Sequence, residues 1–263
     1  MSGPVYQDGV LAHGTHGERE RLRLLEELND PTTVGVLERL GVAADWRCVE
    51  AGAGHGSIAR WLAARCPDGL VTATDLDTAL LTESPVPANL TVERHDVTRD
   101  GFPAGSQDLV HARALLGHLP DPELALDRMA GWLAPGGWLV VEDPTYLPAA
   151  DSPYPEFAAL LEACQELLAR AHGTDHGWAR RIPAAMARSG LTDIGMTMRV
   201  AVCGTDRTED AFWRRCFAQA TPGLIETGLM TAEQITAAVA HLDDPAFTDT
   251  AWMMVSCWGR RPS

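Results

Sequence analysis

Hydrophobic residues near the beginning of the chain recur at helical spacing. A Thr-x-x-Glu pattern at residues 15–18 matches a capping box, and the leucines of residues 22–28 follow it on one helical face. Asp30 and Pro31 then offer an N-cap and a first helical residue, and Gly41 offers a stop. The pattern predicts two helices, one reaching about residue 29 and a second over 31–41.

Short apolar, β-branched runs follow, and helical patterns separate them. The expected strands are 47–50, 70–74, 90–94, 108–113, 138–142, 192–202 and 251–258. The expected helices are 57–66, 121–133, a long amphipathic helix containing the leucines at 160, 161, 167 and 168, a short helix after Pro183, and two more between the last two strands. This alternation predicts an α/β fold with a mostly parallel sheet and helices on both faces.

The first strand runs into an acid and three glycines at alternate positions: Glu50, Gly52, Gly54 and Gly56. Glycines allow positive φ and a close approach of the backbone to a ligand, and the helix that begins at Ser57 presents free N–H groups. A dinucleotide fingerprint would need glycine or alanine at position 57, where serine stands. The loop therefore indicates a nucleotide-like ligand, with a tight turn that binds nothing as the alternative.

Two further acids end strands in the same way. Asp75 follows the second strand, 19 residues after Gly56, where a carboxylate can accept both hydroxyls of a ribose. Asp77 competes for that role, but its position suggests the N-cap of a helix. Asp96 and Val97 follow the third strand, where a carboxylate and a backbone N–H can bind an adenine; an Asx turn at Asp96 is the alternative.

The second half of the predicted sheet contains a series of motifs that resembles a known family. An Asp-Leu-Val strand at 108–110, a His-Leu-Pro-Asp segment at 118–121, a helix, and Leu-x-Pro-Gly-Gly at 133–137 before an apolar strand occur in order. Together with the glycine loop they resemble class I S-adenosylmethionine (SAM) dependent methyltransferases over residues 45–145. The resemblance implies a Rossmann-like seven-stranded sheet with an antiparallel last strand.

The same resemblance implies an organisation and a cofactor site. It implies N-terminal covering helices (1–45), a SAM-binding core (46–143), a helical lid insert (144–190) and the rest of the core sheet with a helical insertion (191–263). The residues expected to bind SAM are Glu50, Gly52, Ala53, Gly54, Gly56, Asp75, Leu76, Asp96, Val97, His111 and Ala112.

Two histidines are candidates for a general base, which an O- or N-acceptor that loses a proton requires. His118, just past the fourth strand, is the first and His111 the second; packing or capping of the next helix is the alternative for His118. The expected acceptor pocket is lined by four aromatic residues, for each of which core packing is the alternative. They are Tyr146, Tyr154, Trp178 and Trp213.

Composition and charge limit the classes of binding partner that we expect for this chain. The net charge of −15 argues against nucleic acid and anionic membranes and favours small neutral or cationic substrates. Six cysteines without a C-x-x-C pair suggest no zinc site, and Gly173 between His172 and His176 suggests a loop rather than a metal site. Without a signal pattern or an apolar run long enough for a membrane span, we expect a soluble cytoplasmic protein. A homodimer stays open.

The resulting hypothesis is a SAM-dependent methyltransferase that modifies the O, N or C atom of a small molecule, similar to bacterial tailoring enzymes of specialised metabolism. Two alternatives also bind SAM: a cyclase that uses the fold without methyl transfer, and a non-catalytic SAM-binding module. An NAD enzyme is a more distant alternative.

Overall fold

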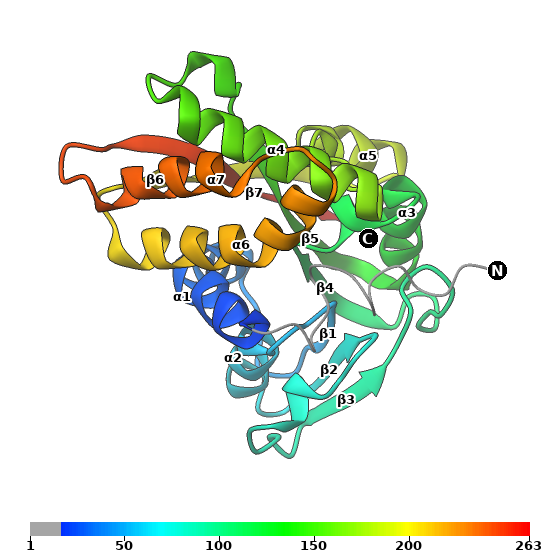
Figure 1. Cartoon of the computed structure of the whole chain (residues 1–263). Coiled ribbons are helices and arrows are strands. Elements are labelled where there is room, and N and C mark those ends of the chain that lie inside the picture. The colour runs from blue at the N-terminus through cyan, green and yellow to red at the C-terminus, as the bar shows by residue number, and fades with distance from the viewer. Residues whose placement is uncertain (1–16) are drawn as a thin grey trace. The chain divides into compact units, whose positions relative to one another are not determined.

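The structure is a computed structural model that describes residues 17–263. Strands and helices alternate along the chain as expected (Figure 1). The strands are β1 (Arg47–Ala51), β2 (Leu70–Asp75), β3 (Leu90–Arg94), β4 (Gln107–Arg113), β5 (Leu133–Tyr146), β6 (Thr192–Cys203) and β7 (Asp249–Arg260). The α-helices are α1 (Glu18–Leu40), α2 (Ser57–Arg65), α3 (Pro122–Trp132), α4 (Pro155–His172), α5 (Ile182–Arg188), α6 (Arg207–Glu226) and α7 (Ala232–Ala240). Short 3₁₀ turns are η1 (Leu80–Thr82), η2 (Leu116–His118), η3 (Ala149–Asp151), η4 (Trp178–Arg181) and η5 (His241–Asp243).

The strands form one seven-stranded sheet in the order β3-β2-β1-β4-β5-β7-β6, with β7 antiparallel. The pairs β2–β3, β1–β2, β1–β4 and β4–β5 are parallel. The order reverses direction at β1, because β2 lies on one side of it and β4 on the other. Ligands bind at such switch points, beyond the carboxyl ends of the strands. The predicted fold class is confirmed.

The chain divides into two compact units. The sheet unit comprises residues 29–144, 177–199 and 254–263, and the helical unit comprises the described residues up to 28 together with 145–176 and 200–253. The predicted lid ran from 144 to 190, but its last part belongs to the sheet unit. Trp178, Ile182 and Met186 explain this, since they are buried in one apolar cluster with Val255 of β7.

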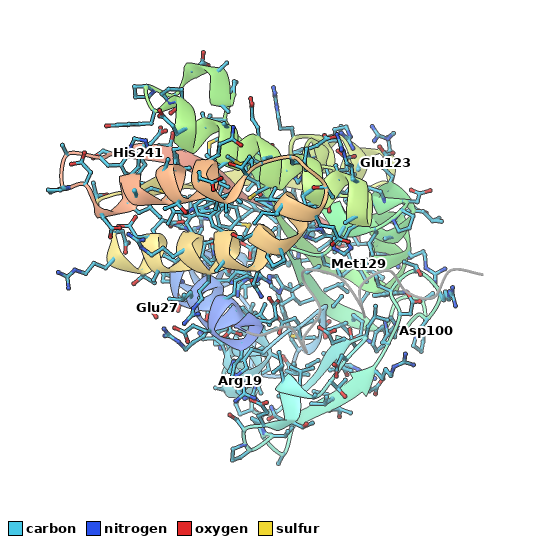
Figure 2. All side chains as sticks on the ribbon, in the orientation of Figure 1. Arg19, Glu27, Asp100, Glu123, Met129 and His241 are labelled. Carbon is cyan, nitrogen blue, oxygen red and sulfur yellow. The ribbon has the colours of Figure 1, made fainter. Side chains whose placement is uncertain are left out.

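Two apolar layers cover the two faces of the sheet unit. Cys48, Val71 and Leu109 point into a cluster shared with α1 and α2. Val49 and Val110, one residue along the same strands, point into a cluster shared with α3 and α5, because alternate residues of a strand face opposite sides. Met129 of α3, labelled in Figure 2, is fully buried in the second layer.

In the helical unit, α4, α6 and α7 pack together (Figure 1). The ring of Phe157 in α4 meets that of Phe217 in α6 and that of Phe247, in the loop after η5, at centroid distances of 5.9 and 5.0 Å. Gly173, at φ 68°, ends α4 immediately after His172, as the sequence suggested.

The prediction of two N-terminal helices is wrong. A single helix, α1, continues through Pro31. Asp30 does not act as the expected N-cap, because its Oδ1 accepts hydrogen bonds from Arg113 (2.8 Å) and from the Ser57 hydroxyl (3.0 Å). These tertiary contacts of Asp30 thus outweigh the local signal for a break between two helices at residues 30 and 31. The continuous helix lacks one main-chain hydrogen bond, because Pro31 has no N–H to donate. The predicted cap at Thr15 lies outside the described residues.

Candidate functional site

The glycine loop joins β1 to α2 at the switch point of the sheet. Gly52, Gly54 and Gly56 all have positive φ, at 65°, 58° and 86°. A Cβ at Gly56 would lie 2.6 Å from the Cδ2 atom of Leu81, and one at Gly52 would lie 2.9 Å from the Cδ1 atom of Leu115. Both positions therefore favour glycine for its conformation, and a Cβ there would also have to displace the Leu81 or Leu115 side chain.

Arg60, which the sequence reasoning missed, braces this loop. Its guanidinium donates to the carbonyl oxygens of His55 (2.9 Å) and Gly56 (3.2 Å) and, through the other terminal nitrogen, to that of Leu81 (2.8 Å). An arginine one turn into a helix is unfavourable beside the positive end of the helix dipole. The unfavourable position of Arg60 in the helix was therefore the feature of the sequence that could have indicated its role in the loop.

Asp75 ends β2 next to the glycine loop. Its Oδ2 accepts the Gly54 N–H at 2.9 Å and its Oδ1 accepts the Asp77 N–H at 3.2 Å. Since each carboxylate oxygen can accept more than one hydrogen bond, ribose hydroxyls can share them. Asp77 itself accepts the Ala79 N–H at 3.0 Å. The helix predicted there is reduced to the 3₁₀ turn η1.

The loop after β3 is stiffened by its own side chains. Asp96 Oδ1 accepts both the N–H (3.0 Å) and the hydroxyl (2.6 Å) of Thr98, which is the Asx turn considered as the alternative. The Val97 side chain is buried in the core, so that only its backbone can face a ligand. Leu76, in the preceding loop, accepts a hydrogen bond from Arg94 through its carbonyl oxygen (3.0 Å).

His111 lies in the middle of a buried charged cluster. Register pairs Glu50 of β1 with His111 of β4, which puts both side chains on the same sheet face. His111 Nδ1 lies 3.5 Å from Glu50 Oε1, and its Nε2 lies 3.3 Å from Glu142 Oε2. Burial alone lowers the pKa of His111, but hydrogen bonds to Glu142 and Glu50 outweigh it and raise the pKa to about 9. A buried imidazolium accepts no proton, so this setting does not support His111 as a general base. Ala112 is buried on the opposite face.

Glu142 is a second residue that the sequence reasoning missed. Its Oε1 accepts the Ser256 hydroxyl and its Oε2 accepts the Thr33 hydroxyl, both at 2.5 Å. Burial raises the pKa of Glu142, but hydrogen bonds and the charges of His111 and Arg113 lower it below its ordinary value. The sequence feature that could have identified Glu142 is an acid at the end of an apolar run, as for Glu50.

His118 ends the 3₁₀ turn η2, immediately beyond β4. The turn begins after Ala114, whose φ of 51° is unusual for a residue with a Cβ. The Ala114 N–H donates to the Glu142 carbonyl oxygen at 2.7 Å, which holds this conformation in place. Strained backbone of this kind is concentrated at functional sites. His118 is half-buried.

The aromatic residues expected to line an acceptor pocket are engaged in packing. Trp178 is fully buried in the sheet unit. In the helical unit, Trp213 is buried and its indole N–H donates to Glu209 (3.1 Å). Tyr154 packs edge-on against Phe247, and Tyr146 packs edge-on against His176. The packing alternative describes Trp178 and Trp213 best.

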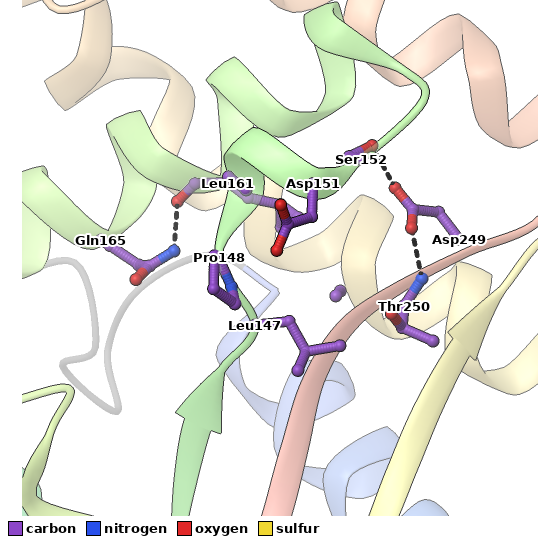
Figure 3. A pocket seen from close by; sticks show the side chains of 10 residues that line it. Leu147, Pro148, Asp151, Ser152, Leu161, Gln165, Asp249 and Thr250 are labelled. Atoms are coloured by element: carbon purple, nitrogen blue, oxygen red, sulfur yellow. Dashed lines mark hydrogen bonds between the residues drawn. The ribbon is translucent and has the colours of Figure 1, made fainter.

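A recess of about 410 Å³, part of it open to solvent, lies within the helical unit (Figure 3). Asp249 lies at one side of the recess, where its carboxylate accepts hydrogen bonds from the Ser152 hydroxyl (2.6 Å) and the Thr250 N–H (2.7 Å). The lining residues are Leu147, Pro148, Ala149, Asp151, Ser152, Leu161, Gln165, Asp249, Thr250 and Ala251. Apolar and polar residues line the recess in equal number, with two carboxylates among the polar ones, and none of the four predicted aromatic residues lines it.

Residues 17–263 contain no cluster of His, Cys, Asp and Glu able to hold a metal. Within the same range, no helix is both long and apolar enough to cross a bilayer.

The fold and the loop define an α/β domain with a glycine-rich loop at the switch point of its sheet. The family model described as "Methyltransferase domain" matches residues 16–185. The chain belongs to this methyltransferase domain family.

Individual relatives agree with this assignment. "Methyltransferase str3" of Strobilurus tenacellus is 33% identical over 158 residues, covering 57% of this chain and 53% of that protein. "Trans-aconitate 2-methyltransferase" of Methylobacterium nodulans is 28% identical over 207 residues, covering 77% and 72%. Among solved structures, geranyl diphosphate C-methyltransferase from Streptomyces coelicolor A3(2) has a TM-score of 0.57 at 15% identity, covering 98% and 86%. The match spans about half the length of str3.

Proposed function

We propose that the chain is a SAM-dependent methyltransferase that acts on a small molecule in specialised metabolism. The observation that carries this proposal is the glycine loop with its two acids, Glu50 and Asp75, at the carboxyl ends of adjacent parallel strands. Membership of the methyltransferase domain family supports it.

The residues of the sheet unit fit the cofactor. Glu50 has a buried oxygen, Oε2, without a hydrogen-bond partner among the described residues, which suits the ammonium of an amino acid. Asp75 suits the ribose hydroxyls. Asp96 and the Val97 N–H suit the adenine.

A bound SAM supplies a methyl group on a positively charged sulfur, which a nucleophile can attack directly. The chain then has to hold the cofactor in one orientation, keep water out and place the acceptor, and correct placement alone accounts for much of the acceleration. His118, carried on the strained turn after β4, is our candidate to take the proton from a hydroxyl or amine acceptor.

The charge of the chain favours a neutral or cationic acceptor. A net charge of −15 repels polyanions, and Asp151 and Asp249 place carboxylates in the recess of the helical unit. This argues against trans-aconitate, the acceptor named for several relatives.

The test is turnover with SAM and a panel of phenols, amines and enols, with trans-aconitate included. The expected result is S-adenosylhomocysteine formed in equal amount with a methylated product, measured by mass spectrometry. The Asp75→Ala variant serves as the matched control, with greatly reduced turnover at low SAM. A cyclised product without S-adenosylhomocysteine, or binding of SAM without turnover of any acceptor, would count against the proposal.

A further inference from the structure

The His111 ring lies between two buried carboxylates, which favour its protonated form. Glu50, His111 and Glu142 are 4%, 0% and 1% exposed. A neutral imidazole has one N–H and can donate to one carboxylate, whereas an imidazolium donates from both nitrogens. Both ring nitrogens face a carboxylate oxygen, at 3.5 and 3.3 Å. Nε2 is within hydrogen-bond distance of Glu142, and Nδ1 lies against Glu50 without a hydrogen bond among the described residues, so the two neighbouring carboxylates favour the cation.

The two carboxylates on either side of this ring differ in how fully they are used. Glu142 accepts hydroxyl hydrogen bonds at both oxygens, from Ser256 and Thr33, in addition to facing the ring. Glu50 faces the ring with Oε1 alone, and its buried Oε2 has no partner among residues 17–263. A buried carboxylate oxygen without a donor is costly. It is the expected state of a group whose partner is a ligand.

The charges around the ring leave one negative charge uncompensated. Arg113 of β4 pairs with Asp30 of α1 at 2.8 Å. The groups facing the cluster are therefore three carboxylates (Glu50, Glu142 and Asp30) and two cations (His111 and Arg113). α1 and β7 contribute the neutral hydroxyls of Thr33 and Ser256 in addition. A cationic ligand group at Glu50 would balance the cluster.

We propose that His111 is a positioning residue for cofactor binding, whose imidazolium keeps Glu50 and Glu142 ionised side by side and leaves Glu50 Oε2 available to the cofactor's ammonium group. The inference rests on the proposed function, because it assigns the ammonium to SAM. It gives His111 a role other than proton transfer.

The variant His111→Gln tests the idea because it removes the cation between the two carboxylates. One carboxyl group then has to bind a proton, since two neighbouring buried carboxylates repel each other. We expect the Kd of S-adenosylhomocysteine at pH 7, measured by calorimetry, to rise at least about tenfold. Affinity should then increase as the pH is raised from about 6 to 8.5 and Glu50 loses its proton, whereas the wild type stays nearly constant over this range.

A double variant separates charge balance from packing. His111→Gln with Glu142→Gln removes one cation and one anion, which leaves Glu50 as the only carboxylate beside position 111. Its Kd should return to within about threefold of the wild type and lose the pH dependence. His176→Gln is the matched control, because His176 of the helical unit contacts the Gln165 carbonyl oxygen rather than a carboxylate. It should bind S-adenosylhomocysteine as the wild type does.

Nitrogen-15 NMR of the ligand-free wild type gives an independent readout. Both ring nitrogens of His111 should carry protons between pH 6 and 8. A neutral ring, an unchanged Kd in His111→Gln, or a loss that is constant with pH and not restored in the double variant would each overturn the inference. Wild-type protein that binds neither SAM nor S-adenosylhomocysteine would instead overturn the proposed function.

Discussion

Replacement of Asp75 by alanine tests the cofactor site most directly. In the bound state, the carboxylate is expected to accept two ribose hydroxyls, and charge-assisted hydrogen bonds contribute about 1.5–3 kcal/mol each. The loss of both corresponds to about 3 kcal/mol or more, which is an increase of more than about 100-fold in Kd. Asp75 also holds the Gly54 N–H at 2.9 Å, so that the variant loosens the glycine loop and the effect should exceed this lower limit.

The assay is calorimetric titration with S-adenosylhomocysteine at pH 7, after circular dichroism has shown that the variant is folded. Asp77→Ala is the matched control: Asp77 is an exposed acid two residues away in the same loop. Its change in Kd should stay within about threefold, or 0.6 kcal/mol. If Asp75→Ala binds as tightly as Asp77→Ala, the ribose is held elsewhere and the reasoning from the end of β2 is refuted.

Three other predictions concern the sheet unit. Gly56→Ala, which places a Cβ at φ 86° and 2.6 Å from Leu81, should lower the free energy of unfolding by about 1–3 kcal/mol in urea titrations, whereas Gly35→Ala, with open space around it, should not. His118→Ala should lower kcat at least about 100-fold while leaving the Kd of SAM nearly unchanged; an unchanged kcat at saturating acceptor would remove it from the mechanism. Burial raises the pKa of Asp143 to about 8, so the folded state holds a proton that the unfolded state releases near pH 4, and stability should fall between about pH 4 and 8. Asp143→Asn should flatten that slope in urea unfolding measured at pH 5 and pH 8, and an identical slope in both proteins would contradict the assignment.

Features that depend on neighbouring residues in the sequence could be predicted. The glycine loop, the acid at the end of β2 and the beginning of a helix at Asp121 are local patterns, and in the structure Asp121 caps α3 by accepting the Leu124 N–H at 2.9 Å. β3 begins and ends where the apolar run predicted. Such features follow from backbone chemistry within a few residues, which no distant part of the chain has to supply.

Features that depend on register and burial could not be predicted in the same way. The cluster around His111 exists because Glu50, His111 and Glu142 come to lie on one sheet face, and that requires the pairing of β1 with β4 and of β4 with β5. The sequence shows three polar residues at the ends of apolar runs, but not that they meet. Likewise, the sequence around Trp178 fits a core position as well as a position in an acceptor pocket. Only the burial of Trp178 in the sheet unit distinguishes these two interpretations.

The carboxyl groups of Glu142 and Asp143 are neighbours in β5, but their pKa values are shifted in opposite directions. Successive strand residues face opposite sides, so Glu142 meets His111, Thr33 and Ser256 and has a lowered pKa. Asp143 is equally buried but faces the other way, where the backbone of Gly117 and Leu115 and the Trp178 side chain lower its pKa by less than burial raises it. Its raised pKa follows from that burial. The negative charge of Glu142 within β5 therefore lies on the sheet face that carries Glu50, where it can stabilise an ammonium group.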